Sequence, residues 1–118
     1  MITPTRTPRR TKRMTAEELA AWSGRAGRSE LVKGVYVAMS PGSGGHGAVG
    51  ATAGYWIMDH VRRHRAGRVY AAKTGFILFR NPDTVRAPDA AFLRFPRADH
   101  PLDQQGFIEG PPDLAVEV

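Results

Sequence analysis

The sequence has no cysteine, which excludes disulfide bonds and thiolate metal ligands and is consistent with a reducing cytoplasm. It also lacks a long hydrophobic run, because no window approaches the roughly 18 consecutive apolar residues that a membrane span requires. The basic N-terminus is not followed by an apolar stretch, so it is not a secretory signal. These absences predict a cytoplasmic protein without a membrane segment.

Acidic residues are missing from the N-terminus. Residues 1–13 contain five basic side chains and no acid, whereas residues 14–118 contain 12 basic and 11 acidic residues. The net charge of +6 is therefore mostly a property of a tail rich in Thr, Pro and Arg. Such a tail cannot bury enough apolar surface to fold, so we expect it to be disordered. A solubilising extension is favoured over a dedicated phosphate-binding arm.

Residues 14–118 are long enough for one small domain, and the composition of the chain, 42% apolar and 24% charged, is ordinary for a globular protein. A capping-box pattern, Thr15 with Glu18 three residues later, predicts a short helix over 16–22. Two apolar runs on either side of Gly34 predict a hairpin over 29–39.

The later elements are predicted from periodicity. A Gly-rich loop over 40–47 leads into a helix over 46–65, in which apolar residues recur at intervals of three and four and which ends at Gly67. Two strands are expected, each as one continuous apolar run. The remaining predicted segments are the strands over 68–80 and 85–95, the turn over 81–83, the polar loop over 97–112 and a last strand from 114 to 118.

This order of elements predicts an α/β (α+β) fold in which one mixed β-sheet is flanked by helices. The last predicted strand stops inside its apolar run. We therefore expect the fold to be incomplete at the C-terminus, with residues 14–118 forming the N-terminal part of a larger domain.

Two carboxylates stand out because each is the only charge in an apolar, strand-like run: Asp89 in residues 87–93 and Glu117 in residues 114–118. Burying a carboxylate is costly without a compensating cation. Two such groups on neighbouring strands would face each other only around a metal ion, since like charges repel. Mg²⁺ prefers oxygen ligands and takes one or two carboxylates with waters. The alternative, that either acid simply points to solvent, stays open on pattern alone.

Six segments occur in an order and spacing that resemble the Uma2 family, a group of endonucleases with the restriction-endonuclease-like, PD-(D/E)xK fold. Residues 14–19 also resemble a typical start of that family. The resemblance covers residues 14–118, and its strength lies in the ordered set. The segments are SELVKG at 29–34, MSP at 39–41, HG at 46–47, KTGF at 73–76, VRAPDAAF at 85–92 and PDLAVEV at 112–118.

The resemblance implies a restriction-endonuclease-like core and assigns roles to three acids. Asp89 matches the metal-binding Asp of the family's Pro-Asp motif, and Glu117 matches its second metal-binding acid. Glu30 matches an acid of the first hairpin that joins or supports the catalytic site, although a plain cross-strand surface charge is an equal alternative for it. The cofactor so implied is Mg²⁺ or Mn²⁺.

Two accessory residues and one departure follow from the same resemblance. His46 matches a recurrent His before the long helix, for which a structural role is favoured over substrate contact. Lys73 lies where similar proteins often have Glu, and we assign it no catalytic role. The PD-(D/E)xK pattern requires a lysine two residues after the second acid, but the chain ends at Val118. We therefore expect the 118-residue chain to be an inactive fragment.

Two functional hypotheses remain. The first is a Mg²⁺-dependent endonuclease that hydrolyses phosphodiester bonds of DNA, with Asp89, Glu117 and Glu30 at its site and a homodimer left open. The second is a non-catalytic module that binds nucleic acid through the basic end of the long helix. Its candidate residues are Arg62, Arg63, Arg65 and Arg68. An idle, solvated helix end is the favoured interpretation of that cluster alone.

Overall fold

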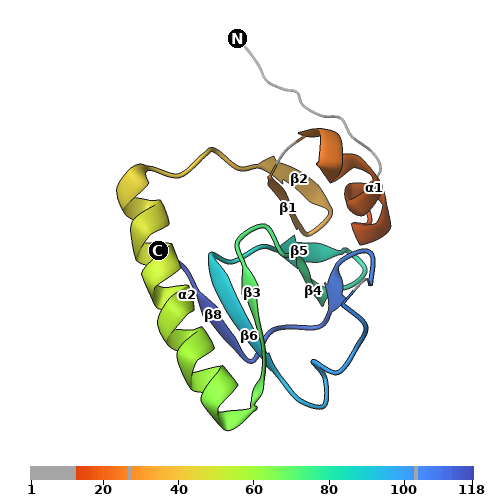
Figure 1. Ribbon diagram of the computed structural model, residues 1–118. Coiled ribbons are helices and arrows are strands. Elements are labelled where there is room, and N and C mark those ends of the chain that lie inside the picture. The colour runs from red at the N-terminus through yellow and green to blue at the C-terminus, as the bar shows by residue number, and fades with distance from the viewer. Residues whose placement is uncertain (1–12, 27, 103) are drawn as a thin grey trace.

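The computed structural model describes residues 13–26, 28–102 and 104–118. This part of the chain forms two helices and eight strands, arranged in two sheets (Figure 1). None of its helices is long and apolar enough to cross a membrane. The elements in order are α1 Ala16–Ala26, β1 Ser29–Val32, β2 Val35–Ala38, α2 Gly44–His64, β3 Gly67–Ala71, β4 Phe76–Phe79, β5 Thr84–Arg86, β6 Ala90–Arg94, β7 Ile108–Glu109 and β8 Leu114–Val116.

The predicted α+β class is confirmed, but the expectation of a single sheet is wrong. The first sheet has the strand order β2-β1-β5-β4-β7 and is mixed, because β7 runs parallel to β4 while the other pairs are antiparallel. The second sheet has the order β3-β6-β8 and is antiparallel throughout. In Figure 1, α1 lies beside the first sheet and α2 runs alongside the second.

Two predicted strands are each divided between the sheets. The run over 68–80 breaks into β3 and β4, where Lys73 adopts a left-handed conformation with φ 77°. The run over 85–95 breaks into β5 and β6 at Pro88, which has no N–H for a ladder bond. Apolar residues continue on both sides of each break, so hydrophobic pattern alone does not reveal where the chain changes sheets.

The local signals at α1 and the hairpin are confirmed. The Glu18 N–H donates to Thr15 Oγ1 at 3.1 Å, and the Thr15 N–H donates to Glu18 Oε1 at 2.8 Å, which is the reciprocal capping box. The turn between β1 and β2 has φ 49° at Lys33 and 80° at Gly34, the two positive angles of a type I′ hairpin turn. The helix itself extends beyond the predicted end, to Ala26.

The ends of α2 differ from prediction. The helix begins at Gly44, inside the predicted loop, because the Ser43 side chain caps it by accepting from the His46 N–H at 3.1 Å. It ends at Arg65, which takes the left-handed conformation with φ 50°, and not at Gly67. Gly67 instead begins β3, where an added Cβ would overlap the Leu93 carbonyl oxygen. The predicted loop over 97–112 also contains a short strand, β7.

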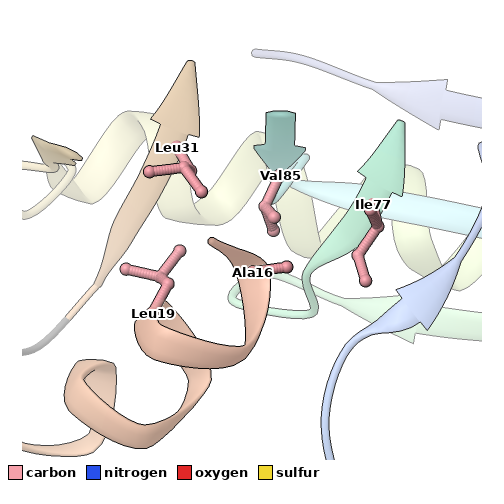
Figure 2. Packing of buried hydrophobic residues seen from close by; sticks show 5 residues of the cluster. All are labelled: Ala16, Leu19, Leu31, Ile77 and Val85. Carbon is pink, nitrogen blue, oxygen red and sulfur yellow. The ribbon is translucent and has the colours of Figure 1, made fainter. Parts of the chain in front are cut away.

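The principal core cluster lies between α1 and the first sheet. Ala16 and Leu19 of α1 point toward Leu31 of β1, Ile77 of β4 and Val85 of β5 (Figure 2). These side chains are almost fully buried. Since α1 and the sheet each bury one apolar face against the other, this contact holds the hairpin and the central strands in one layer.

Helix α2 is buried only near its C-terminal end, at Val61. Val49 and Trp56, which follow the predicted helical period, are 55% and 62% exposed. Of the predicted disordered tail, residues 1–12 lie outside the described residues. Arg13 is described, and it donates from Nη1 to the Lys33 carbonyl oxygen at 2.7 Å, so it packs on the hairpin.

Candidate metal and nucleic-acid site

Asp89 and Glu117 lie at the same end of the second sheet. Asp89 directly precedes β6 and Glu117 directly follows β8, and the two strands pair antiparallel with Ala90 opposite Val116. The Asp89 N–H donates to the Val116 carbonyl oxygen at 2.9 Å, which continues the pairing up to the acids. The register therefore places Asp89 and Glu117 on neighbouring chain segments.

Asp89 is held from three directions. Its side chain is 6% exposed. Oδ2 accepts from the Val118 N–H at 2.7 Å and lies 3.3 Å from His46 Nε2, while Oδ1 lies 3.5 Å from Arg28 Nη2. The hydrogen bond from Val118 lowers the pKa of Asp89; burial opposes it, and the charges of His46 and Arg28 reinforce it. Asp89 therefore stays ionised at neutral pH.

Glu117 has the opposite shift. Desolvation raises its pKa first, and the negative charges of Asp89 and Glu30 raise it further, while Arg28 and Arg86 act in the opposite direction. The three carboxylates are thus close enough for their charges to interact. Bringing like charges together in this way leaves an excess of negative charge that a cation would offset.

Glu30 is buried, at 5% exposure, so the alternative of a surface charge is wrong. Its Oε1 accepts from Arg86 Nη1 at 2.9 Å and its Oε2 accepts from the Ala87 N–H at 2.8 Å. Both bonds go to the segment that leads from β5 into Asp89. Glu30 therefore fixes the chain where it passes from the first sheet to the second.

Arg28 belongs to the site but was missed in the sequence. It precedes β1, and its Nη2 donates to the Ala87 carbonyl oxygen at 2.9 Å besides approaching Asp89. Its Nε is buried without a hydrogen-bond partner among the described residues. No local pattern marks Arg28, because its position depends on long-range pairing of β1 with β5. The one signal in the sequence is its place two residues before Glu30.

His46 lies closer to the acids than the favoured structural role implied. It stands in the first turn of α2, where its N–H completes the Ser43 cap while its ring faces Asp89. Gly42 makes room for the ring, since an added Cβ there would come 2.8 Å from His46 Nδ1. The same turn thus caps the helix and brings an imidazole to Asp89.

A groove of about 640 Å³ extends from Asp89 along α2. Gly47, Gly50 and Gly54 line its helix wall, and β3 forms the opposite wall. Arg28, His46 and Asp89 lie together among its lining residues, so the groove opens onto the acid end of the sheet.

Lys73 and the basic cluster, the other candidate site residues, do not lie beside Asp89 and Glu117. Lys73 is exposed in the turn between β3 and β4 and is not among the charges with the largest effects on Asp89 or Glu117. The basic cluster lies at the other end of α2, about 24 Å from His46 at 1.5 Å per residue. Within it, Arg63 pairs with Asp59 at 2.7 Å and Arg68 contacts His100 at 3.3 Å, while Arg62 and Arg65 are exposed.

Residues 16–118 match the model of the Uma2 family, described as a putative restriction endonuclease. The chain belongs to the Uma2 family. No curated protein matches it. Membership in a family of restriction-endonuclease type makes this Uma2 chain nuclease-like and implies a nucleic-acid substrate.

Restriction-endonuclease-like proteins generally use a divalent metal ion, and the donors of this Uma2 chain fit one. Asp89 and Glu117 offer a pair of carboxylates at one end of the second sheet. Desolvation, and then the charges of Asp89 and Glu30, raise the pKa of Glu117. Mg²⁺ typically takes one or two carboxylates and completes its shell with water. Within residues 13–26, 28–102 and 104–118, no group of three or more His, Cys, Asp or Glu side chains is arranged to hold a metal.

Proposed function

We propose that this Uma2 protein is a Mg²⁺-dependent endonuclease that hydrolyses phosphodiester bonds of DNA. One observation carries the proposal: Asp89 and Glu117 flank paired strands at one sheet end, with Glu30 near enough to raise the pKa of Glu117. Among the described residues no base forms an ion pair with Glu117, whereas Glu17 is paired with Arg80 at 3.0 Å.

Each residue would have a distinct part in the reaction. Asp89 and Glu117 would hold Mg²⁺ or Mn²⁺, and the ion would supply activation of a water and neutralisation of charge on the phosphate. Asp89 is kept ionised and oriented by the Val118 N–H, His46 and Arg28. Glu30 acts as a positioning residue, since it anchors the Ala87 N–H just before Asp89. Hydrolysis adds water across one P–O ester bond, and the leaving oxygen takes up a proton.

Binding of Mn²⁺ by the purified protein, followed by isothermal titration, tests the site directly. Asp89→Asn keeps the shape of the side chain and removes its charge, so we expect Mn²⁺ affinity to fall at least about tenfold. Asp59→Asn is the matched control, because Asp59 pairs with Arg63 on the far part of α2. Equal affinity in the Asp89→Asn and Asp59→Asn variants would contradict the assignment.

Nicking of supercoiled plasmid with Mg²⁺ tests the activity. The 118-residue chain by itself is expected to be inactive, so the proposal expects metal-dependent nicking by a protein extended beyond Val118, which Asp89→Asn and Glu117→Gln abolish and Asp59→Asn retains. Absence of nicking by an extended protein that binds Mn²⁺ and retains DNA would instead favour the non-catalytic binding module.

A further inference from the structure

The groove beside the acids has an open helix wall that packing does not require. An added Cβ would meet nothing within 4 Å at Gly47 or Gly54, and at Gly50 only a Val118 methyl at 4.0 Å. Glycine is among the poorest residues for a helix interior, so these positions sacrifice helix stability without gaining a close contact. Their effect is to keep the space between α2 and β3 open.

The two ends of the groove differ in chemistry. At the acid end, Arg28 presents a guanidinium whose buried Nε has no partner among the described residues, and Asp89 is the only acid among the described residues that line the groove. Further along, the walls carry Tyr55, which is 60% exposed, with Val69 and Ala71 opposite. The Tyr70 ring lies on the other face of β3, where it contacts Phe76 and His100. Measured along α2 from His46 to Met58, the groove is about 18 Å long.

From this arrangement we infer that the groove binds an unpaired DNA strand, with Arg28 contacting a phosphate and Tyr55 stacking on a base. The inference rests on the proposed function, because it places the phosphate beside Asp89. Arginine binds phosphate through its forked donors, and Arg28 lines the groove together with Asp89. Aromatic side chains stack on unpaired bases regardless of sequence. A duplex keeps its bases stacked inside and offers nothing to an apolar groove of this size.

Fluorescence anisotropy of labelled oligo(dT) of about ten nucleotides, and of a duplex of equal length, tests the inference. Ca²⁺ replaces Mg²⁺, since it takes the same oxygen ligands. We expect the single strand to bind at least about tenfold more tightly than the duplex, the loss that one unpaired stacking contact accounts for. Binding of the duplex as tight as or tighter than binding of the single strand would overturn the inference. Tighter binding of an RNA strand of equal length than of oligo(dT) would overturn the choice of DNA.

Filling the groove gives a sharper test. Gly54→Leu places a side chain in open space and improves helix propensity, so the fold should survive, as a thermal melt would show. Thr52→Leu introduces the same side chain at an exposed position of α2 outside the groove. We expect Gly54→Leu to weaken single-strand binding about tenfold and Thr52→Leu to leave it unchanged. Equal binding by the two variants would overturn the inference.

Arg28→Gln tests the phosphate contact separately. Loss of one phosphate contact should lower the slope of log affinity against log salt by about 0.7 for a single strand, and an unchanged slope would remove Arg28 from the inference. Titration of the same variants with Mn²⁺ separates the two proposals. If Asp89→Asn binds Mn²⁺ normally while Gly54→Leu loses the strand, the metal site is wrong and the groove assignment stands.

Discussion

At the residue scale, Asp83 shows how a buried carboxylate can be fully committed to structure. It is 7% exposed, and its oxygens accept from the Ala16 N–H at 2.8 Å, the Asn81 N–H at 3.0 Å and Arg80 Nη1 at 3.0 Å. One side chain thus ties the start of α1 to the turn between β4 and β5. Asp89 differs, because its contacts with Arg28 and His46 are longer, at 3.5 Å and 3.3 Å, and, after desolvation, its charge raises the pKa of Glu117.

We predict that Asp83→Asn destabilises the protein by about 1–3 kcal/mol at neutral pH, the cost of leaving buried donors poorly satisfied. Burial raises the pKa of Asp83, but the two backbone N–H groups and Arg80 outweigh it, so the folded-state pKa lies below the ordinary value. The stabilisation is therefore present above the unfolded-state pKa and is lost as pH falls through the folded-state pKa. Urea unfolding across pH measures it.

The gap between wild type and Asp83→Asn should accordingly close in strong acid, where the aspartate is protonated. A gap of constant size at all pH values would show that the charge of Asp83 has no role. Asp99→Asn, at an exposed position, serves as the control and should leave the stability profile unchanged.

Residues with local signals could be predicted from the sequence, and those with remote partners could not. The Thr15–Glu18 cap lies within one turn, and the pattern identified it. Asp83 was placed in a turn, but its bond to Ala16 spans 67 positions. The contact of Arg28 with Asp89 spans 61 positions. Such pairs depend on which strands become neighbours, a property that no short segment of sequence contains.

At the element scale, α1 depends on Leu19, which is completely buried against the first sheet (Figure 2). Leu19→Ala should cost about 2–5 kcal/mol through lost burial and the cavity left behind. Val35→Ala on β2 is the comparison, because Val35 is 54% exposed and should change stability by less than about 1 kcal/mol. Similar losses in the two variants, measured by urea unfolding, would show that the α1 contact adds little.

The close pairing of β3 with β6 depends on Gly67. Substitution by Ala would bring a Cβ into the carbonyl of Leu93, so β3 would have to move away from β6. We expect Gly67→Ala to lower the unfolding midpoint. Gly44→Ala should leave it unchanged or raise it, because an added Cβ meets nothing within 4 Å there. Equal midpoints for the two variants would show that β3 can shift freely.

The elements themselves were largely predictable, but their division was not. Turn chemistry at Gly34 and the periodicity of α2 gave a hairpin and a helix of the correct kind. Each of the two long apolar runs predicts one strand, because a segment that crosses between sheets stays apolar on both sides of the crossing. The resemblance to the Uma2 family assigned Asp89 and Glu117 to the site. The sequence pattern alone left open that the Asp89 side chain points to solvent.

At the scale of the whole molecule, positive charge and the acidic site are separated. The exposed Arg62 and Arg65 lie at the end of α2 remote from His46, and most of the net charge of +6 resides in residues 1–13. Charge in a tail adds affinity that is independent of sequence and sensitive to salt. We therefore expect changes in the basic residues 1–13 to alter DNA binding, and changes in the acids of the site to alter hydrolysis.

Deleting residues 1–12 tests this separation and keeps Arg13, which bonds to the hairpin. The deletion removes four cations, so the slope of log affinity for duplex DNA against log salt should fall by up to about 3.6. Mn²⁺ affinity should remain unchanged. Identical DNA retention by the two proteins at low salt would exclude a role for the tail.

The crossing of the chain between the sheets has a mechanical consequence for the site. Glu30 belongs to the first sheet, whereas Asp89 and Glu117 stand at the end of the second, and the segment at Ala87 and Pro88 is the short joint between them. Any rocking of one sheet against the other would alter the spacing of these carboxylates before it disturbed either sheet. The distance from the Glu30 carboxylate to those of Asp89 and Glu117 therefore depends on the angle between the two sheets. A rigid segment at Ala87 and Pro88 would keep the geometry around a bound ion well defined.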